Sequence, residues 1–337
     1  MLKWKILEKV LPLKFNWNIS RNLSFEKKNF FIQVSDFNNY GIGEVAPNIR
    51  YNENEELIKN QFEKFIEISS NIKNIDELNN ILNSIKLCNS LRFGIESSFI
   101  HYLCQKNKIL PYKFLKLKRP NYINTSFSIP IMELDNIENF IKINNLKRFS
   151  SLKIKVNSEN AIDMISFISK LTNQKLRIDA NEAWKDVDEL IKFTEKIKKF
   201  NIEFIEQPMP ASMKEEYFYY KKHCPFDLIA DESIENEGDF EYLSKAFTGI
   251  NVKLMKAGGY FNAIKLLNKA RKSNLKTMLG CMIETSLGIY SAFNISNNID
   301  YIDLDGFLII KEDTFNLVYE NEGKLFVNKE QELLEYF

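Results

Sequence analysis

Three short stretches of the chain decide its fold: residues 176–179 (LRID), 204–206 (FIE) and 228–231 (LIAD). Each stretch is an apolar, β-rich run that ends in a carboxylate. Between the first two lie residues 186–200, whose apolar side chains recur at helical spacing. Strands that alternate with amphipathic helices predict parallel β/α units.

Polar residues end similar β-rich runs at a steady interval along most of the chain. These positions are Ser128, Lys155, Asp179, Glu206, Asp231, Lys253, Cys281 and Asp303. Neighbouring positions are 22 to 28 residues apart, enough for one strand, one helix and two loops. Eight units predict an α/β fold with a closed (β/α)8-type barrel, a modified TIM barrel, whose strand ends meet at one mouth. A doubly wound open sheet would also alternate strands and helices, but it would spread the polar ends along an edge.

The length of 337 residues leaves room for a smaller domain beside a barrel of about 250 residues. Residues 30–46 contain two β-rich runs around a turn, and residues 56–72 have apolar side chains at helical spacing. We therefore predict an α+β capping domain over residues 1–118 and a catalytic β/α barrel over residues 119–314. Residues 315–337 are expected to pack back on the capping domain.

Charge and hydropathy exclude several classes of partner. Lysine and arginine number 46 against 45 acidic residues, so the net charge of +1 offers no basic field to nucleic acid or an anionic membrane. The longest apolar stretch, residues 278–289, is interrupted by Glu284 and is too short to span a bilayer. Residues 1–15 alternate charged and apolar side chains, unlike a signal peptide, which favours a cytoplasmic protein.

Cysteine and histidine offer little chemistry here. The four cysteines have no paired spacing, and the chain has only two histidines, so a thiol zinc site is not expected. Acid–base chemistry must therefore rest mainly on Lys, Asp, Glu or Tyr.

Asp179, Glu206 and Asp231 end three consecutive predicted strands. Neighbouring strand ends meet in a barrel, and three carboxylates at one point repel each other strongly unless a cation lies between them. All-oxygen ligands of this kind suit Mg²⁺, with Mn²⁺ as a substitute. We predict that these three residues hold the metal.

Lysines end the strands on either side of the three acidic ones. Lys153 and Lys155 close the preceding strand, and Lys253 closes the following strand. Lys155 and Lys253 would face each other across a bound substrate, which predicts a two-base arrangement. A nearby cation and a second ammonium group would both lower a lysine pKa toward neutrality.

The sequence resembles a known family over nearly its whole length. The segments that carry the resemblance are Lys153-Ile154-Lys155, Asp179-Ala180-Asn181, Glu206-Gln207-Pro208, Ala230-Asp231-Glu232-Ser233 and Asn251-Val252-Lys253, with Gly41-Ile42-Gly43-Glu44 and Pro47 in the first domain. They resemble the muconate-cycloisomerase-like branch of the enolase superfamily. The resemblance implies a capped barrel with lysine bases and bound Mg²⁺.

The residues of the predicted strand eight resemble one group within this branch more than the others. Asp303 and Asp305 look like the Asp-x-Asp motif of dipeptide epimerases, and residues two apart on a strand face the same side. Their carboxylates would receive the ammonium group of a dipeptide. Residues 280–285 resemble the strand-seven segment of Ala-Glu epimerases, with cysteine where we expect serine. Backbone contacts to the substrate are implied there, at Cys281, Met282 and Ile283.

The implied function is a dipeptide epimerase that inverts the α-carbon of the carboxy-terminal residue, with L-Ala-L-Glu and L-Ala-D-Glu as the leading pair. One lysine removes the α-proton to give an enediolate, and the other lysine returns a proton. Supporting roles are implied for Lys153, Asn181 and Glu284. A first-domain arginine would bind the side-chain carboxylate of the substrate, either Arg21 or Arg50 in the neighbouring loop.

Other functions stay open. A cycloisomerase of the same superfamily needs neither Asp303 nor Asp305, an acid-sugar dehydratase usually relies on histidine, and an N-acyl amino acid racemase takes substrates without a free ammonium. A catalytically silent barrel scaffold is the non-enzyme alternative. The expected partner is a small dipeptide, and its specificity, a homo-oligomer and the pathway are not determined by the sequence.

Overall fold

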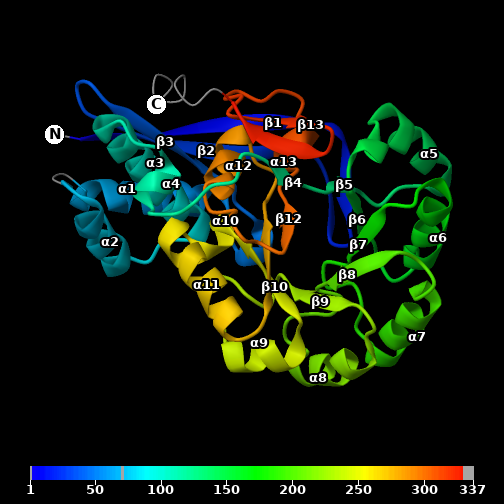
Figure 1. Ribbon diagram of the computed structural model, residues 1–337. Coiled ribbons are helices and arrows are strands. Elements are labelled where there is room, and N and C mark those ends of the chain that lie inside the picture. Colours follow the sequence, from blue (N-terminus) through cyan, green and yellow to red (C-terminus); the bar gives the residue numbers. More distant parts are fainter. Residues whose placement is uncertain (1, 70–71, 329–337) are drawn as a thin grey trace.

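The computed structural model describes residues 2–69 and 72–328. Its first domain has an antiparallel sheet of β1 (Lys3–Ile19), β2 (Asn22–Ser35) and β3 (Tyr40–Val45). Its helices are α1 (Glu55–Ile68), α2 (Ile75–Ser84), α3 (Asn89–Asn107) and α4 (Pro111–Phe114), with the 3-10 turn η1 (Ile49–Tyr51) before them (Figure 1). A Cβ on Gly41 or Gly43 would lie 2.1 Å from a carbonyl oxygen of α3, so these glycines let β3 and α3 approach closely.

The helix predicted over residues 56–72 ends earlier than expected. Helix α1 ends at Ile68, where the Ser69 backbone N–H donates to the Ile66 carbonyl at 3.3 Å. The prediction was wrong beyond this point because Ile72 continues the apolar spacing. Ile72 is buried in the same core cluster as α1, but it lies outside the helix.

The second domain is an eight-stranded parallel sheet whose hydrogen-bonded order runs from β12 back to β5. Its strands are β5 (Phe127–Ile129), β6 (Ser151–Lys155), β7 (Lys175–Asp179), β8 (Ile202–Glu206), β9 (Asp227–Ala230), β10 (Gly249–Lys253), β11 (Lys276–Gly280) and β12 (Tyr301–Asp303). The predicted polar residues lie in these strands or directly after them. The predicted barrel architecture with its α+β cap is therefore confirmed.

Side chains bridge the two ends of this sheet. Leu304 N–H donates to Thr125 Oγ1 at 2.9 Å, and Ser128 N–H donates to Asp305 Oδ2 at 2.6 Å. Ser126 Oγ donates to Asp303 Oδ1 at 2.8 Å. The residues that join β12 to β5 therefore include both acidic residues of the strand-eight motif.

Helices surround the barrel strands, as Figure 1 shows. They are α5 (Leu134–Ile143), α6 (Ala161–Leu171), α7 (Val187–Ile197), α8 (Lys214–His223), α9 (Phe240–Ala246), α11 (Tyr260–Lys272) and α12 (Ser286–Phe293), with the short elements η2 (Leu146–Arg148), α10 (Leu254–Ala257) and α13 (Gly306–Ile309). Helix α7 begins where the Asp186 side chain accepts from two backbone N–H groups, and it buries Leu190, Phe193 and Ile197 against the core. No helix in the described ranges is long and apolar enough to cross a membrane.

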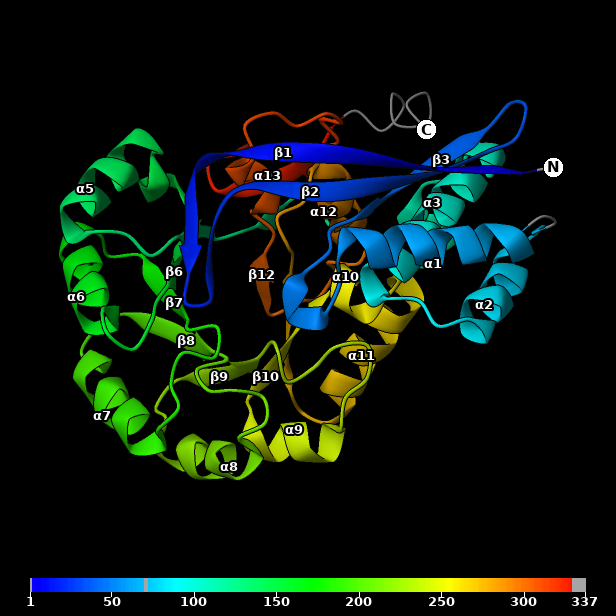
Figure 2. The ribbon, with the colours of Figure 1, turned by 180° about the vertical axis from the view of Figure 1, so that it is seen from behind.

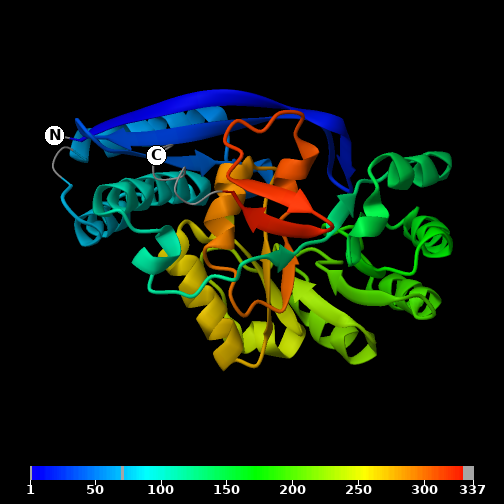
Figure 3. The same cartoon turned by 45° about the horizontal axis from the view of Figure 1, so that its top comes forward.

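The chain after strand eight contacts both domains, so the expectation that residues 315–337 pack back on the capping domain stays a prediction. Strands β13 (Val318–Asn321) and β14 (Lys324–Val327) form a hairpin that pairs with β4 (Ile123–Asn124) at the start of the barrel part (Figure 3). Phe315 reaches the first domain, with its ring centroid 5.2 Å from that of Phe31. The apolar spacing of residues 315–327 could not show that β14 would pair with β4, because spacing does not identify the partner of a strand. Residues 329–337 lie outside the described residues, and the boundary at residue 118 stays a prediction.

Candidate active site

A cavity of about 530 Å³ lies at the carboxyl ends of the barrel strands. In Figure 2 the paired strands β1 and β2 run above α12 and α13 and then bend down toward β7 and β8. The barrel contributes lysines and acids to the cavity wall, and the first domain contributes Trp17, Ile19, Arg21, Lys27 and Arg50. The site is therefore built from both domains.

Asp179, Glu206 and Asp231 occupy neighbouring strand ends, as predicted. Asp179 and Glu206 pair across β7 and β8, and Asp231 follows β9 directly. All three are at most 2% exposed. Burial, with the charges of Asp179 and Asp231, raises the pKa of Glu206 to about 7. Burial also acts on Asp179, but there Lys153 and Lys155 outweigh it and hold the pKa below its usual range.

The three predicted lysines neutralise these carboxylates. Lys153 Nζ lies among the carboxylates of Asp303, Glu206 and Asp179, at 2.7, 2.8 and 2.9 Å. Lys155 Nζ lies 2.6 Å from Asp179 Oδ2, and Lys253 Nζ lies 2.8 Å from Asp231 Oδ2. Because Lys155 and Lys253 belong to β6 and β10, they enter the cavity from separate sides.

The ion pair between Lys253 and Asp231 acts against the expected lowering of the lysine pKa. Burial lowers the pKa of this ammonium, but the Asp231 carboxylate outweighs burial and the value is raised. The expectation considered the neighbouring cations and left out the ion pair with Asp231, which favours the charged form.

The fit of a divalent cation can be judged from the carboxylate oxygens. Within residues 2–69 and 72–328, no three Asp, Glu, His or Cys side chains converge on one ion position, because the lysines share the carboxylates. Glu206 Oε2 is buried and accepts no hydrogen bond from these residues, although Lys153 Nζ lies 2.8 Å away. The donor set is all oxygen and lies on neighbouring strand ends, so its chemistry fits Mg²⁺.

Asp303 and Asp305 both line the cavity. Asp303 accepts from Ser126 and Lys153, and Asp305 accepts from the Ser128 backbone N–H. Burial and the charge of Asp303 raise the pKa of Asp305 to about 7. A cationic group in the cavity would favour the ionised form of both carboxylates.

The strand-seven segment lines the cavity with Cys281, Met282 and Ile283. Two of its backbone groups already have partners: Met282 N–H donates to Glu284 Oε1 at 2.8 Å, and the Ile283 carbonyl accepts from Asn29 Nδ2 at 3.0 Å. Cys281 Sγ donates to the Asp303 carbonyl at 3.4 Å. Glu284 thus holds the segment through the Met282 N–H, and burial together with Glu44 raises the pKa of Glu284 to about 8.

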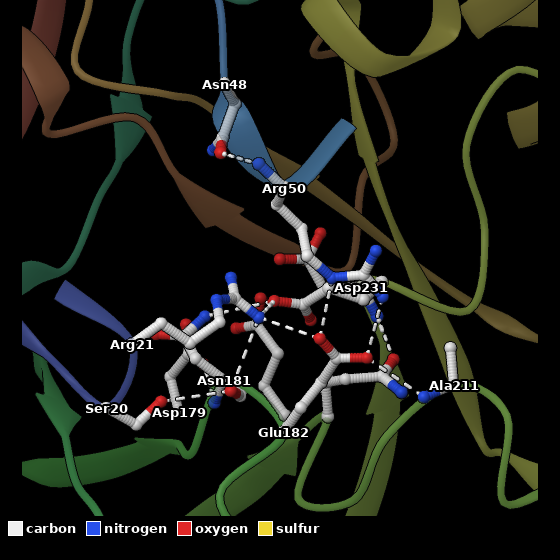
Figure 4. A network of polar contacts seen from close by, with 12 residues as sticks. Ser20, Arg21, Asn48, Arg50, Asp179, Asn181, Glu182, Ala211 and Asp231 are labelled. Atoms are coloured by element: carbon white, nitrogen blue, oxygen red, sulfur yellow. Dashed lines mark hydrogen bonds and ion pairs between the residues drawn. The ribbon is translucent and has the colours of Figure 1, made fainter. Parts of the chain in front are cut away.

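Arg21 and Arg50 meet at one acidic residue on the barrel rim, Glu182 (Figure 4). Arg50 uses Nε and Nη2 for the two oxygens of Glu182, at 2.7 and 2.9 Å. Arg21 uses Nη1, which lies 2.9 Å from Glu182 Oε2 and 2.7 Å from Glu232 Oε1. Nε and Nη2 of Arg21 have no hydrogen-bond partner among the described residues, so one edge of its guanidinium fork stays available.

Two residues of the site, Glu182 and Lys256, were not predicted from the sequence. Asn181 was predicted and accepts from Lys155 Nζ at 3.2 Å, but its neighbour Glu182 was not considered. Lys256 is 2% exposed and donates to the Asp231 side chain and to the carbonyls of Ile234 and Asn251. Lys256 could have been predicted from its position three residues after Lys253, the lysine that ends strand six. No local pattern marks Glu182.

The sequence matches known proteins over the barrel part and over nearly the whole chain. Residues 141–322 match a family model described as enolase C-terminal domain-like. The chain is 34% identical over 331 residues to the L-Ala-D/L-amino acid epimerase of Pedosphaera parvula (strain Ellin514), which covers 94% of this chain and 93% of that protein.

Solved structures share the fold. The L-Ala-D/L-Glu epimerase from Bacillus subtilis, in a substrate-liganded complex, matches with a TM-score of 0.89 and 23% identity over 96% of this chain and 95% of that chain. The dipeptide epimerase from Enterococcus faecalis V583, complexed with Mg and L-Leu-L-Tyr, matches with a TM-score of 0.88 and 24% identity over 97% and 96% of the two chains.

Proposed function

The chain belongs to the enolase superfamily, and from this premise we propose that it is a dipeptide epimerase. The reaction inverts the α-carbon of the carboxy-terminal residue, with L-Ala-L-Glu and L-Ala-D-Glu as the leading pair. One observation carries the proposal: Lys155 and Lys253 enter the same cavity from separate strands, and Asp303 and Asp305 line it too. Opposed lysines suit inversion, and paired carboxylates suit a free ammonium group.

In this proposal Lys155 and Lys253 exchange roles with the direction of reaction. The lysine that faces the α-hydrogen accepts the proton at Nζ, and the opposite ammonium donates a proton to the other face of the enediolate. Lys153 Nζ is buried among carboxylates at the cavity floor, where its charge stabilises the negative charge that develops on the substrate. Asn181 orients Lys155, and Glu284 orients the strand-seven segment.

Asp179, Glu206 and Asp231 would hold the metal, which we propose to be Mg²⁺ with Mn²⁺ as a substitute. When bound, Mg²⁺ would hold the substrate carboxylate and supply positive charge against it. The Enterococcus faecalis dipeptide epimerase complexed with Mg supports this choice. A cytoplasmic location and the lack of nucleic-acid and membrane partners remain proposals, supported by the net charge of +1, and a homo-oligomer stays open.

The function is tested with a dipeptide library in D₂O. Each dipeptide is incubated with enzyme and Mg²⁺, and mass spectrometry reports which members gain deuterium at the α-carbon. Exchange confined to dipeptides with a free amino terminus is expected. If no dipeptide exchanges, the proposed function is wrong.

N-acetylation of the substrate is expected to stop turnover. Acetyl removes the positive charge that Asp303 and Asp305 would bind, and it leaves two buried carboxylates facing a neutral amide. The measurement compares kcat/KM of the wild-type enzyme for Ala-Glu and N-acetyl-Ala-Glu. Similar values for the two compounds would contradict the assignment and favour an N-acyl amino acid racemase.

Arg21→Met is expected to lower kcat/KM for Ala-Glu by about 1.5–3 kcal/mol and to spare Ala-Leu. The free edge of the Arg21 guanidinium can take a carboxylate at two points, whereas the equivalent edge of Arg50 is used by Glu182. Steady-state kinetics on both dipeptides checks this expectation. An equal loss on both substrates, or no loss on either, would remove Arg21 as the group that reads the carboxy-terminal side chain.

A further inference from the structure

The cations of the cavity wall differ in whether they have an acidic partner. Those that line the cavity are Arg21, Lys27, Arg50, Lys153, Lys155 and Lys253. Each of them except Lys27 forms an ion pair with a buried or half-buried carboxylate. Within residues 2–69 and 72–328, the Lys27 side chain makes neither a hydrogen bond nor an ion pair. Unlike the other five cations of the cavity wall, Lys27 therefore has its whole charged group available to an anion from outside the protein.

An unpaired ammonium group at this position is expected to lower the stability of the fold. Lys27 is half-buried, and burial lowers its pKa without any opposing carboxylate. Removing a charge from water without a partner destabilises a fold. The adjacent Lys28 faces the other side of the strand, where Glu8 and Glu55 lie 2.9 and 2.7 Å from its Nζ. Lys28, on the outer face, therefore has acidic partners, whereas Lys27, on the cavity face, has none among the described residues.

The position of Lys27 differs from that of Arg21. Lys27 pairs across the sheet with Leu11, which packs with Ile283 and Ile309 beside strands seven and eight. Asn29, two residues along the same face of β2, donates to the Ile283 carbonyl. In Figure 2 strand β2 runs over α12 and α13, while the tip of the β1–β2 hairpin bends away toward β7 and β8.

Lys27 and the Asp303–Asp305 pair therefore lie at the same end of the cavity. The proposed function places the ammonium group of the dipeptide at that pair, so the side chain nearest to Lys27 is that of the amino-terminal residue. Arg21 lies at the other end, with Glu182 and Glu232. The two ends of the cavity can thus bind the side chains of different residues of the dipeptide.

We propose that Lys27 binds an acidic side chain on the amino-terminal residue of the dipeptide. This inference rests on the proposed function and adds a specificity residue to it. The substrate class would include dipeptides that begin with Glu or Asp, beside those that begin with Ala. Lys27 donates from Nζ to the side-chain carboxylate, and it takes no part in proton transfer.

The test uses two matched substrate pairs in the presence of Mg²⁺. Glu-Glu and Gln-Glu differ at the amino-terminal side chain, and Ala-Glu and Ala-Gln differ at the carboxy-terminal side chain. Lys27→Met is expected to lower the kcat/KM ratio of Glu-Glu to Gln-Glu by about tenfold to a hundredfold, the scale of a charge-assisted hydrogen bond. The ratio of Ala-Glu to Ala-Gln should not change.

Three controls separate this role from a structural one. Lys27→Arg should keep most of the Glu-Glu preference, because it keeps the charge. Lys28→Met, one residue along and on the outer face, should leave both ratios at the wild-type value. The Tm of Lys27→Met should not fall below that of the wild type, because the variant removes an unpaired half-buried charge.

Each outcome decides the inference. A change in the Ala-Glu ratio instead of the Glu-Glu ratio would overturn it, and so would no change in either ratio. Calorimetric binding of Glu-Glu and Gln-Glu to the wild type and to Lys27→Met tests Lys27 even if turnover is absent, in which case the epimerase function fails separately. Exchange with N-succinyl-glutamate but not with any dipeptide would also overturn both assignments, since that compound lacks the ammonium group.

Discussion

Glu206→Gln is expected to lower the rate of dipeptide epimerisation by about 10²- to 10³-fold and to leave the fold unchanged. Glutamine keeps the size of the side chain and an oxygen that can accept from Asn251 Nδ2, which donates to Glu206 Oε1 at 2.8 Å. The change removes the charge of the buried Oε2, the oxygen without a hydrogen bond from the described residues. Polarimetry follows epimerisation, calorimetry follows Mg²⁺ binding, and circular dichroism follows the fold.

The corresponding change at Asp231 is expected to affect stability as well as activity. Asp231→Asn should also abolish turnover, but it leaves the Lys256 ammonium buried without its acidic partner. Breaking a buried ion pair in this way costs about 3–5 kcal/mol of stability. Asp188→Asn, at an exposed position in the first turn of α7, serves as the matched control and should retain activity. Full activity after exhaustive EDTA treatment would rule out the metal assignment.

Lys155→Ala and Lys253→Ala are each expected to stop epimerisation, with losses of about 10²- to 10⁴-fold. Each direction needs a base on one face of the α-carbon and an acid on the other. Exchange of the α-hydrogen with D₂O can survive on the face that keeps its lysine. Proton NMR on the separate L,L and L,D dipeptides reports which enantiomer at the carboxy-terminal residue still exchanges.

Arginine variants separate proton transfer from charge. Lys155→Arg and Lys253→Arg keep a cation beside Asp179 and Asp231, so the ion pairs of the wild type are retained. A guanidinium does not lose its proton at accessible pH, so these variants should be as inactive as the alanine variants. If both alanine variants lose exchange on the same enantiomer, the opposed arrangement is wrong.

Local sequence patterns were enough to predict the architecture. Strands and helices have fixed side-chain periods, and the polar residues at 22- to 28-residue intervals placed the strand ends within a residue or so. The motif at Glu206 and the motif at Asp303 were visible because each is contiguous. The predicted end of α1 failed because Ile72 keeps the apolar spacing after the helix has stopped.

Pairings between distant side chains were decided by the tertiary structure. Lys153 and Asp303 are 150 residues apart, and Arg50 and Glu182 are 132 residues apart, yet both pairs form direct contacts. No spacing rule links such residues, because their separation is set by how the barrel closes and how the cap lies on it. The unpaired state of Lys27 is likewise a property of its surroundings and not of its neighbours in sequence.

The sequence by itself therefore determined which chemical groups reach the barrel mouth, because strand ends follow from local backbone geometry. The tertiary structure alone decided which of these groups neutralise one another and which remain open to a substrate. That distinction is electrostatic, because a charge inside the cavity is neutralised only when an opposite charge lies a few ångströms away. Such partners come from elements that are far apart in the chain.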